Sequence, residues 1–211
     1  KGRYHAFRGG PAHRRTGDIP DPRNDGFHQL RACGRAEYPN DDEEYLSTVT
    51  RHIRPARESD IPFILTILEA ARSIMRSSGN PNQWKPGYPT EEMIRKDIAG
   101  EHGQVMEEDH RLVAYFAFIP SPEPTYAVIE GGSWLDDRLP YHVIHRIASF
   151  PDVHGVFRSI MDWSFARESN IRVDTHRDNK IMQHCLLSYG FQYCGIIYLL
   201  NGDERLAFQK L

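Results

Sequence analysis

Two residues of this chain, His145 and Glu130, have the chemistry of a base that accepts a proton. The segment 141–149 follows a strand pattern, and regular alternation places Tyr141, Val143, His145 and Ile147 on one face. An imidazole titrates near 6.5 in general and can accept a proton at neutral pH, so His145 is the first candidate. Glu130 is the second. Two simpler interpretations stay open: a half-buried strand histidine and a solvated acid in a turn.

Asp174 and His176 lie on either side of the end of another predicted strand, 171–174. They are polar candidates for the same chemistry, although Asp174, Arg177 and Asp178 would also suit a surface ion-pair cluster. His176 and His184 lack a third residue at a metal-ligand spacing. The sequence therefore predicts no metal site.

A predicted strand runs into a predicted helix through positions 152–157. The first N–H groups of a helix have no partner within the helix, and the helix dipole adds partial positive charge there, so such a turn attracts anions. Asn179, at the start of a later helix, is a candidate ligand contact or simply a helix cap. The turn itself is formed by Asp152, Val153, His154, Gly155, Val156 and Phe157.

Aromatic and amide side chains gather in the loop 80–89, which is rich in proline and glycine. Aromatic walls with a few amides suit a small organic amine. An equally simple account has Trp84 anchoring the loop onto the domain. The candidate residues for binding such a ligand are Gln83, Trp84, Tyr88 and, after the strand predicted at 126–130, Trp134.

The elements that would position these residues follow from hydrophobic periodicity and capping signals. Helices are predicted after Ser59, after Thr90, after Gly155 and over 179–189, with Ser59 and Thr90 as N-caps. The order is one strand, two helices, several strands, then strand, helix, strand, helix and two strands. Strands are predicted at 49–54, 104–107, 112–119, 126–130, 141–149, 171–174, 192–200 and 205–209.

The composition separates a short leader from a domain. The only Ile, Leu and Val residues in the first fifty positions are Ile19, Leu30, Leu46 and Val49, among ten glycines and prolines. Such a segment buries too little apolar surface to offset its ordering entropy. We therefore predict a disordered or non-native extension at 1–48 and one domain at 49–211. The net charge of −3 supplies no general attraction for nucleic acid.

The order of elements over residues 50–211 resembles the GNAT (GCN5-related) N-acetyltransferase family. The opening 52–61, HIRPARESDI, resembles the usual start of the family, and 179–191 resembles its Asn…Gly-Phe helix and turn. The resemblance implies a mixed α/β fold, with a central mixed β-sheet flanked by helices, in a single GNAT-like domain. It also implies acetyl-CoA as co-substrate.

The resemblance assigns roles to the candidates named above. Where family members carry a carboxylate base on the strand 141–149, that base shares the face of His145. The coenzyme A pyrophosphate would bind at the turn, so the implied cofactor contacts are Ile147, Ala148, Val153, His154, Gly155, Val156, Phe157 and Asn179.

Three positions depart from the family pattern. Asp152 brings negative charge to the phosphate turn, and Phe157 replaces a small residue. Leu186 occupies the position of the tyrosine that often protonates the leaving thiolate, and Tyr189 is expected to pack at the helix end. These departures keep a second hypothesis open, a non-catalytic GNAT-like ligand-binding module with a degraded coenzyme A loop.

The sequence thus predicts an acyl-CoA-dependent N-acetyltransferase that acts on a small-molecule amine by direct attack. No run reaches the roughly 20 apolar residues that a membrane helix needs, and no apolar signal region follows the early basic residues. A cytoplasmic location without membrane attachment is therefore expected. Nucleic acid is not an expected partner, and the oligomeric state is left open, with a homodimer as one option.

Overall fold

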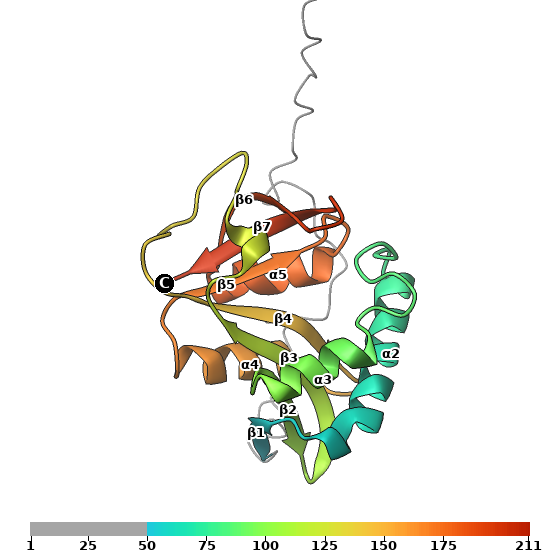
Figure 1. Cartoon of the computed structure of the whole chain (residues 1–211). Helices are drawn as coiled ribbons and strands as arrows, with labels where there is room; N and C mark the ends of the chain where they lie inside the picture. The colour runs from blue at the N-terminus through green and yellow to red at the C-terminus, as the bar shows by residue number, and fades with distance from the viewer. Residues whose placement is uncertain (1–49) are drawn as a thin grey trace, which may run out of the picture.

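A computed structural model describes residues 50–211, so the extension predicted at 1–48 lies outside the described residues. Seven strands and four α-helices make up this part of the chain, with two short 3₁₀ helices (Figure 1). The strands are β1 (Arg51–Pro55), β2 (Gly103–Glu108), β3 (Arg111–Pro120), β4 (His142–Ser149), β5 (Ile171–Thr175), β6 (Gln192–Tyr198) and β7 (Glu204–Lys210). The helices are η1 (Glu58–Asp60), α2 (Ile61–Ser77), α3 (Glu91–Ala99), η2 (Pro124–Tyr126), α4 (Val156–Phe165) and α5 (Lys180–Tyr189).

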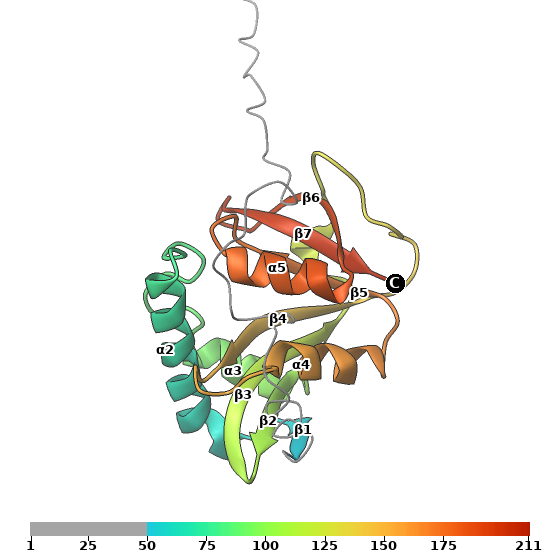
Figure 2. The same ribbon diagram turned by 180° about the vertical axis from the view of Figure 1, so that it is seen from behind.

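The strands form one mixed sheet in the order β1-β2-β3-β4-β5-β7-β6, in which β4 and β5 are the parallel pair. Helices α2 and α3 cover one face, and α4 and α5 cover the other, as the two opposite views show (Figures 1 and 2). Each face has its own apolar cluster, around Ile64 and Ile94 on the first and around Ile160 and Leu186 on the second. The predicted sheet flanked by helices is confirmed.

Side-chain caps mark the beginnings of α3 and α5. The Thr90 hydroxyl accepts the Met93 N–H at 3.2 Å, and Asn179 Oδ1 accepts the Met182 N–H at 3.0 Å. The prediction of Ser59 as an N-cap is wrong, because Ser59 lies inside η1. Asp60 organises that turn instead, and its carboxylate accepts the Arg57 N–H at 2.8 Å.

The strand predicted at 126–130 is also wrong. Pro124 begins η2, and Glu130 forms only an isolated bridge with Ile196. Proline has no N–H to donate to a sheet, and its fixed φ suits the first turn of a helix. The Glu123 side chain accepts the Thr125 N–H at 3.2 Å and completes the turn. Residues 124–126 therefore form a short helix and do not add a strand to the sheet.

Strands β4 and β5 separate soon after they meet. Their parallel pairing joins His142 to Ile171 and Val143 to Arg172, and β4 then continues to Ser149 without β5 beside it. The divergence opens the middle of the sheet next to the later residues of β4. His145 of β4 and Asp174 of β5 both lie beside this opening.

Candidate active site

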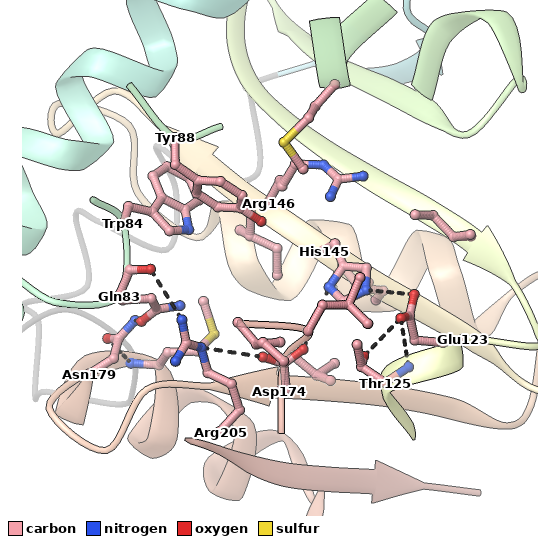
Figure 3. A pocket seen from close by; sticks show the side chains of 18 of the residues that line it. Gln83, Trp84, Tyr88, Glu123, Thr125, His145, Arg146, Asp174, Asn179 and Arg205 are labelled. Atoms are coloured by element: carbon pink, nitrogen blue, oxygen red, sulfur yellow. Dashed lines mark hydrogen bonds and ion pairs between the residues drawn. The ribbon is translucent and has the colours of Figure 1, made fainter. Parts of the chain in front are cut away.

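A pocket of about 430 Å³ lies where β4 and β5 separate (Figure 3). Loop 80–89 and the segment after β3 close its sides, and residues 199–201 and Arg205 close its end. Seven of the candidate residues named from the sequence line it: Gln83, Trp84, Tyr88, His145, Ile147, Asp174 and Asn179. The structure thus brings the first candidate base together with three of the four predicted acceptor-binding residues.

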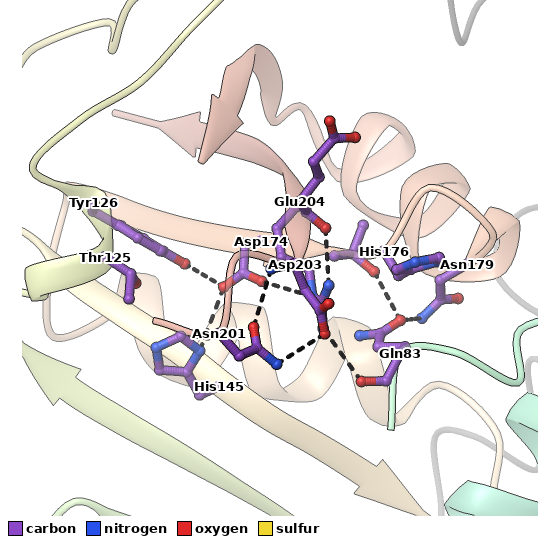
Figure 4. A network of polar contacts seen from close by, with 12 residues as sticks. Gln83, Thr125, Tyr126, His145, Asp174, His176, Asn179, Asn201, Asp203 and Glu204 are labelled. Atoms are coloured by element: carbon purple, nitrogen blue, oxygen red, sulfur yellow. Dashed lines mark hydrogen bonds and ion pairs between the residues drawn. The ribbon is translucent and has the colours of Figure 1, made fainter. Parts of the chain in front are cut away.

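His145 stands between two carboxylates. Its Nε2 lies 3.5 Å from Glu123 Oε2, and its Nδ1 lies 3.6 Å from Asp174 Oδ1. Figure 4 shows Asp174 reaching His145 from the end of β5. The imidazole is one-fifth exposed, so it is shielded while still facing the pocket. A histidine held in this way can take a proton and share the resulting charge with both acids.

Each carboxylate is itself held in place. Glu123 accepts the Thr125 hydroxyl at 2.8 Å, and Asp174 accepts the buried Tyr126 hydroxyl at 2.7 Å. The contact with His145 lowers the pKa of Glu123 to about 2, assisted by Thr125 and opposed by burial. Burial raises the pKa of Tyr126 well above its ordinary value, and the charge of Asp174 adds to this effect. Glu123 is therefore ionised at neutral pH, and Tyr126 remains a donor.

The depressed pKa of Glu123 predicts a change in acid stability. Its folded pKa of about 2 lies below the ordinary 4.5, so its stabilising effect is complete above pH 4.5 and is lost as the pH falls toward 2. In Glu123→Gln, we expect the free energy of unfolding to fall less steeply between pH 4.5 and 2. Urea unfolding at a series of pH values measures this slope. Glu58→Gln removes an exposed ion pair of little energetic weight and should retain the wild-type slope.

A β-bulge in β4 overturns the predicted alternation. Ala117 pairs with His145 and Tyr115 pairs with Ala148, so two residues of β4 oppose one residue of β3. Ile147 consequently packs with the α4 and α5 cluster, and Ala148 packs with the α2 and α3 cluster. The prediction that Ile147 shares the face of His145 is therefore wrong.

The bulge leaves a stretch of backbone outside the strand pairing. Within the described sheet, Arg146 and Ile147 have no partner residue on β3. Arg146 has a φ of 59°, a conformation that typically costs about 1–3 kcal/mol in a residue with a side chain. Both residues line the pocket, so the irregular backbone lies beside the space that a substrate would occupy. A backbone N–H group that no neighbouring strand uses can donate a hydrogen bond to a substrate oxygen.

The turn before α4 has the geometry of an anion site. Gly155 has a φ of 71°, and no side chain among the described residues caps the helix that begins at Val156. The Arg51 guanidinium braces this turn, since it donates to Ser159 Oγ at 3.0 Å and to the carbonyl of His154. Glu108 orients Arg51 through a contact of 2.9 Å. The predicted residues at 153–157 surround this turn and do not line the pocket.

Both departures from the family pattern at this turn have local partners. Asp152 pairs with Arg111 at 2.9 Å and does not cap the helix. The Phe157 ring packs edge-on against Tyr189, with centroids 6.1 Å apart. Tyr189 donates its hydroxyl to Asp162 at 2.6 Å at the end of α5 and does not line the pocket. The negative charge of Asp152 is therefore paired, and Phe157 is a packing residue.

Gln83 ties the aromatic loop to the start of α5. Its Oε1 accepts from Asn179 Nδ2 at 2.7 Å (Figure 4). The same oxygen accepts from Asn80 at 3.0 Å and from Thr175 at 3.3 Å. Asn179 thus caps α5 with one amide atom and anchors the loop with the other. Trp84 is buried beside Tyr88, with ring centroids 6.3 Å apart.

Glu130 and Trp134 also lie outside the pocket. The Glu130 carboxylate accepts the Tyr198 hydroxyl at 3.1 Å. Trp134 stacks on Tyr126 with centroids 5.3 Å apart, and the guanidinium of Arg172 lies 4.0 Å from its ring centroid. Trp134 therefore supports Tyr126, which holds Asp174, and does not form a wall of the pocket.

Sequence reasoning missed several residues of the site. Glu123 was not singled out, because its contact with His145 depends on how η2 turns. Arg205 lines the pocket from β7, 3.9 Å from Asp174, and Arg51 reaches the α4 turn from β1. No local sequence pattern marks these three residues. Their roles come from chain segments that meet only in the folded protein.

Within residues 50–211, no three His, Cys, Asp or Glu side chains are grouped so that they could hold a metal ion. None of the helices described is both long and apolar enough to cross a membrane.

Comparison with solved structures identifies the fold. An acetyltransferase of the GNAT family from Streptococcus agalactiae is 34% identical, with a TM-score of 0.70, over 76% of this chain and 95% of its own. A Staphylococcus aureus structure is 25% identical, with a TM-score of 0.55, over 75% and 97%. A GNAT acetyltransferase from Listeria monocytogenes shares the fold at 18% identity and a TM-score of 0.57, over 76% and 94%.

No family model matches the chain, and no curated protein matches its sequence. The Streptococcus relative nevertheless shares about a third of its residues with this chain along almost its whole length. The predicted resemblance is confirmed, and the chain belongs to the GNAT family of acetyltransferases.

Proposed function

We propose that this protein transfers an acetyl group from acetyl-CoA to the amine of a small molecule by direct attack. The observation that carries the proposal is His145, held between Glu123 and Asp174 in a pocket beside the bulge of β4. A base, an enclosed space for an amine and irregular backbone amides thus occur together. The chain belongs to an acetyltransferase family, and acetyl transfer to an amine needs these three features.

The donor would occupy the opening between β4 and β5. Its pyrophosphate would bind the amides at the start of α4, where Gly155 turns the backbone and Arg51 adds a positive charge nearby. The bulge at Arg146 and Ile147 would meet the thioester end. Ile147 and Asn179, which line the pocket, would contact the donor there.

The acceptor would enter from the side of Trp84 and Tyr88. An alkyl amine is an ammonium ion at neutral pH, with an ordinary pKa of about 10.4. Among the charged side chains of the pocket, Arg146 is paired with Asp97, and Arg205 lies beside Asp174. Glu123, which is ionised, has His145 as its partner there. Because Asp97 and Asp174 offset the two arginines, the carboxylate of Glu123 favours an acceptor that arrives as a cation.

His145 would take the proton that the ammonium must lose before it can attack. The amine nitrogen then forms a bond to the thioester carbon, and the carbon–sulfur bond breaks. The second proton that the nitrogen sheds as it becomes an amide passes to water or to the released thiolate. Backbone N–H groups at the bulge would stabilise the developing oxyanion. A thiol has an ordinary pKa of about 8.5, so the thiolate can leave without an acid. This agrees with Leu186 at the position where many family members have a tyrosine as the acid. Glu123 and Asp174 would stabilise the imidazolium.

Thermal unfolding with acetyl-CoA tests the donor site. A ligand at 100 times its Kd stabilises the folded state by about 2.7 kcal/mol, so we expect a clear rise in Tm at millimolar acetyl-CoA. S-acetylpantetheine, which lacks the pyrophosphate and nucleotide, should raise Tm much less because it cannot use the α4 turn. An unchanged Tm with acetyl-CoA and with other short acyl-CoAs would contradict the proposed donor.

A further inference from the structure

Arg146 is held by a buried polar cluster that the reaction itself does not use. Its Nε and Nη2 donate to the two carboxylate oxygens of Asp97, at 2.8 and 2.5 Å. The Tyr115 hydroxyl donates to the same carboxylate at 2.7 Å. Asp97 lies on α3, and Tyr115 lies on β3. The cluster therefore joins a helix and two neighbouring strands through the carboxylate of Asp97.

The cluster lies in the apolar interior between the sheet and helices α2 and α3. The side chains of Arg146 and Asp97 are 9% and 7% exposed, and Tyr115 is fully buried. Burial is the largest influence and lowers the pKa of Arg146, but the charge and hydrogen bonds of Asp97, with smaller contributions from Tyr115 and Tyr88, together raise it. Arg146 is therefore charged in this setting. A buried ion pair often gives little net stability compared with apolar packing, so its presence calls for a further reason.

The backbone of Arg146 supplies that reason. In a regular strand, position 146 would share the face of Ile144, which lies in the apolar cluster under α4 and α5. A charged guanidinium in that cluster would be unpaired and very costly. The bulge turns Arg146 to the opposite face, where Asp97 receives it. With arginine at position 146, the left-handed backbone and the ion pair therefore support each other.

We propose that Asp97 is a positioning residue that acts through Arg146. By pairing with that side chain on the α3 side of the sheet, it selects the bulged form of β4. The bulge in turn orients His145 and the amides that face the thioester. The roles of His145 and of these amides rest on the proposed function. Tyr115 supports the same carboxylate. Asp97 does not line the pocket, so its effect on the reaction is indirect.

Glycine at position 146 separates the backbone role from a direct role of the side chain. Glycine adopts positive φ at no steric cost, whereas alanine does not. Arg146→Ala should lower kcat about 10- to 100-fold, because a misaligned site loses catalytic efficiency steeply. Arg146→Gly should turn over at least about fivefold faster than Arg146→Ala. Equal kcat values for the two variants would contradict the proposal.

Asp97→Asn tests the helix side of the cluster. We expect kcat to fall about tenfold or more, with the KM for acetyl-CoA changed less than about threefold, because the α4 turn is untouched. In an Arg146→Gly background, the same change should cause no further loss of kcat, since the pair is already absent. A purely stabilising role would lower Tm and leave kcat unchanged when each variant is assayed well below its own Tm. That result would overturn the proposal.

Crystal structures of the variants test the bulge independently of turnover. Arg146→Gly should keep the positive φ at position 146 and the pairing of Tyr115 with Ala148. In Arg146→Ala and Asp97→Asn, this pairing should shift or φ should become negative. A bulge that persists unchanged in both contradicts the inference. If the wild-type protein releases no thiol with any amine, the proposed function fails, but this comparison still decides whether Asp97 holds the bulge.

Discussion

His145→Ala is expected to lower turnover by about 10²- to 10⁴-fold, the range contributed by one positioned acid–base group. The substitution removes the proton acceptor between Glu123 and Asp174. It also leaves those two carboxylates without their shared partner, so the ammonium form of the acceptor would be held but not deprotonated. The kcat for thiol release from acetyl-CoA measures the loss, with a saturating amine as acceptor.

Two controls make this result specific. The Tm rise with acetyl-CoA should survive in His145→Ala, because the α4 turn does not involve His145. His142→Ala removes another half-buried histidine of the same strand, which stacks on Phe118 and does not line the pocket. It should retain most of the activity at temperatures below its Tm. A His145→Ala variant with unchanged turnover would remove His145 from the mechanism.

Gly155→Val is expected to lower acetyl-CoA affinity by at least about tenfold, which corresponds to about 1.4 kcal/mol. Gly155 has a φ of 71°, and a β-branched residue is a severe outlier there. A Cβ at this position would also lie 3.2 Å from Arg51 Nη1, against the guanidinium that braces the turn. Both effects would misdirect the helix amides. Calorimetric titration with acetyl-CoA measures the affinity.

Gly79→Val is the matched control for strain. Gly79 has a φ of 81° after α2, and a Cβ there meets no heavy atom within 4 Å among the described residues. Both variants should lose stability, since each forces a branched side chain into the left-handed region. Only Gly155→Val should lose acetyl-CoA affinity. Equal affinities in the two variants would show that the turn before α4 does not bind the donor.

Features set by neighbours in sequence could be predicted well. Thr90 and Asn179 cap their helices because each needs only an N–H three residues later. The strand at 141–149 and its histidine were also predictable, since alternation is local. The 126–130 strand failed because Pro124 begins a turn whose form depends on the partners of Glu123 and Tyr126.

Features set by distant segments could not be predicted. The alternation of strand 141–149 does not by itself predict the bulge, because Asp97 of α3, which receives the side chain of Arg146, lies 49 residues away in the sequence. Glu123 and Asp174 meet at His145 only after β3, β4 and β5 are assembled. A charged residue at a position that alternation assigns to an apolar face is the one signal that could have suggested the bulge.

Thiol release from acetyl-CoA across a panel of small amines tests the central claim most directly. The account predicts release that depends on both enzyme and amine, that saturates with each substrate, and that His145→Ala largely abolishes. Amines that are cations at neutral pH should be the better acceptors, because Glu123 is ionised in the pocket. Binding of acetyl-CoA with no thiol release for any amine would contradict catalysis and support a non-catalytic GNAT-like binding module.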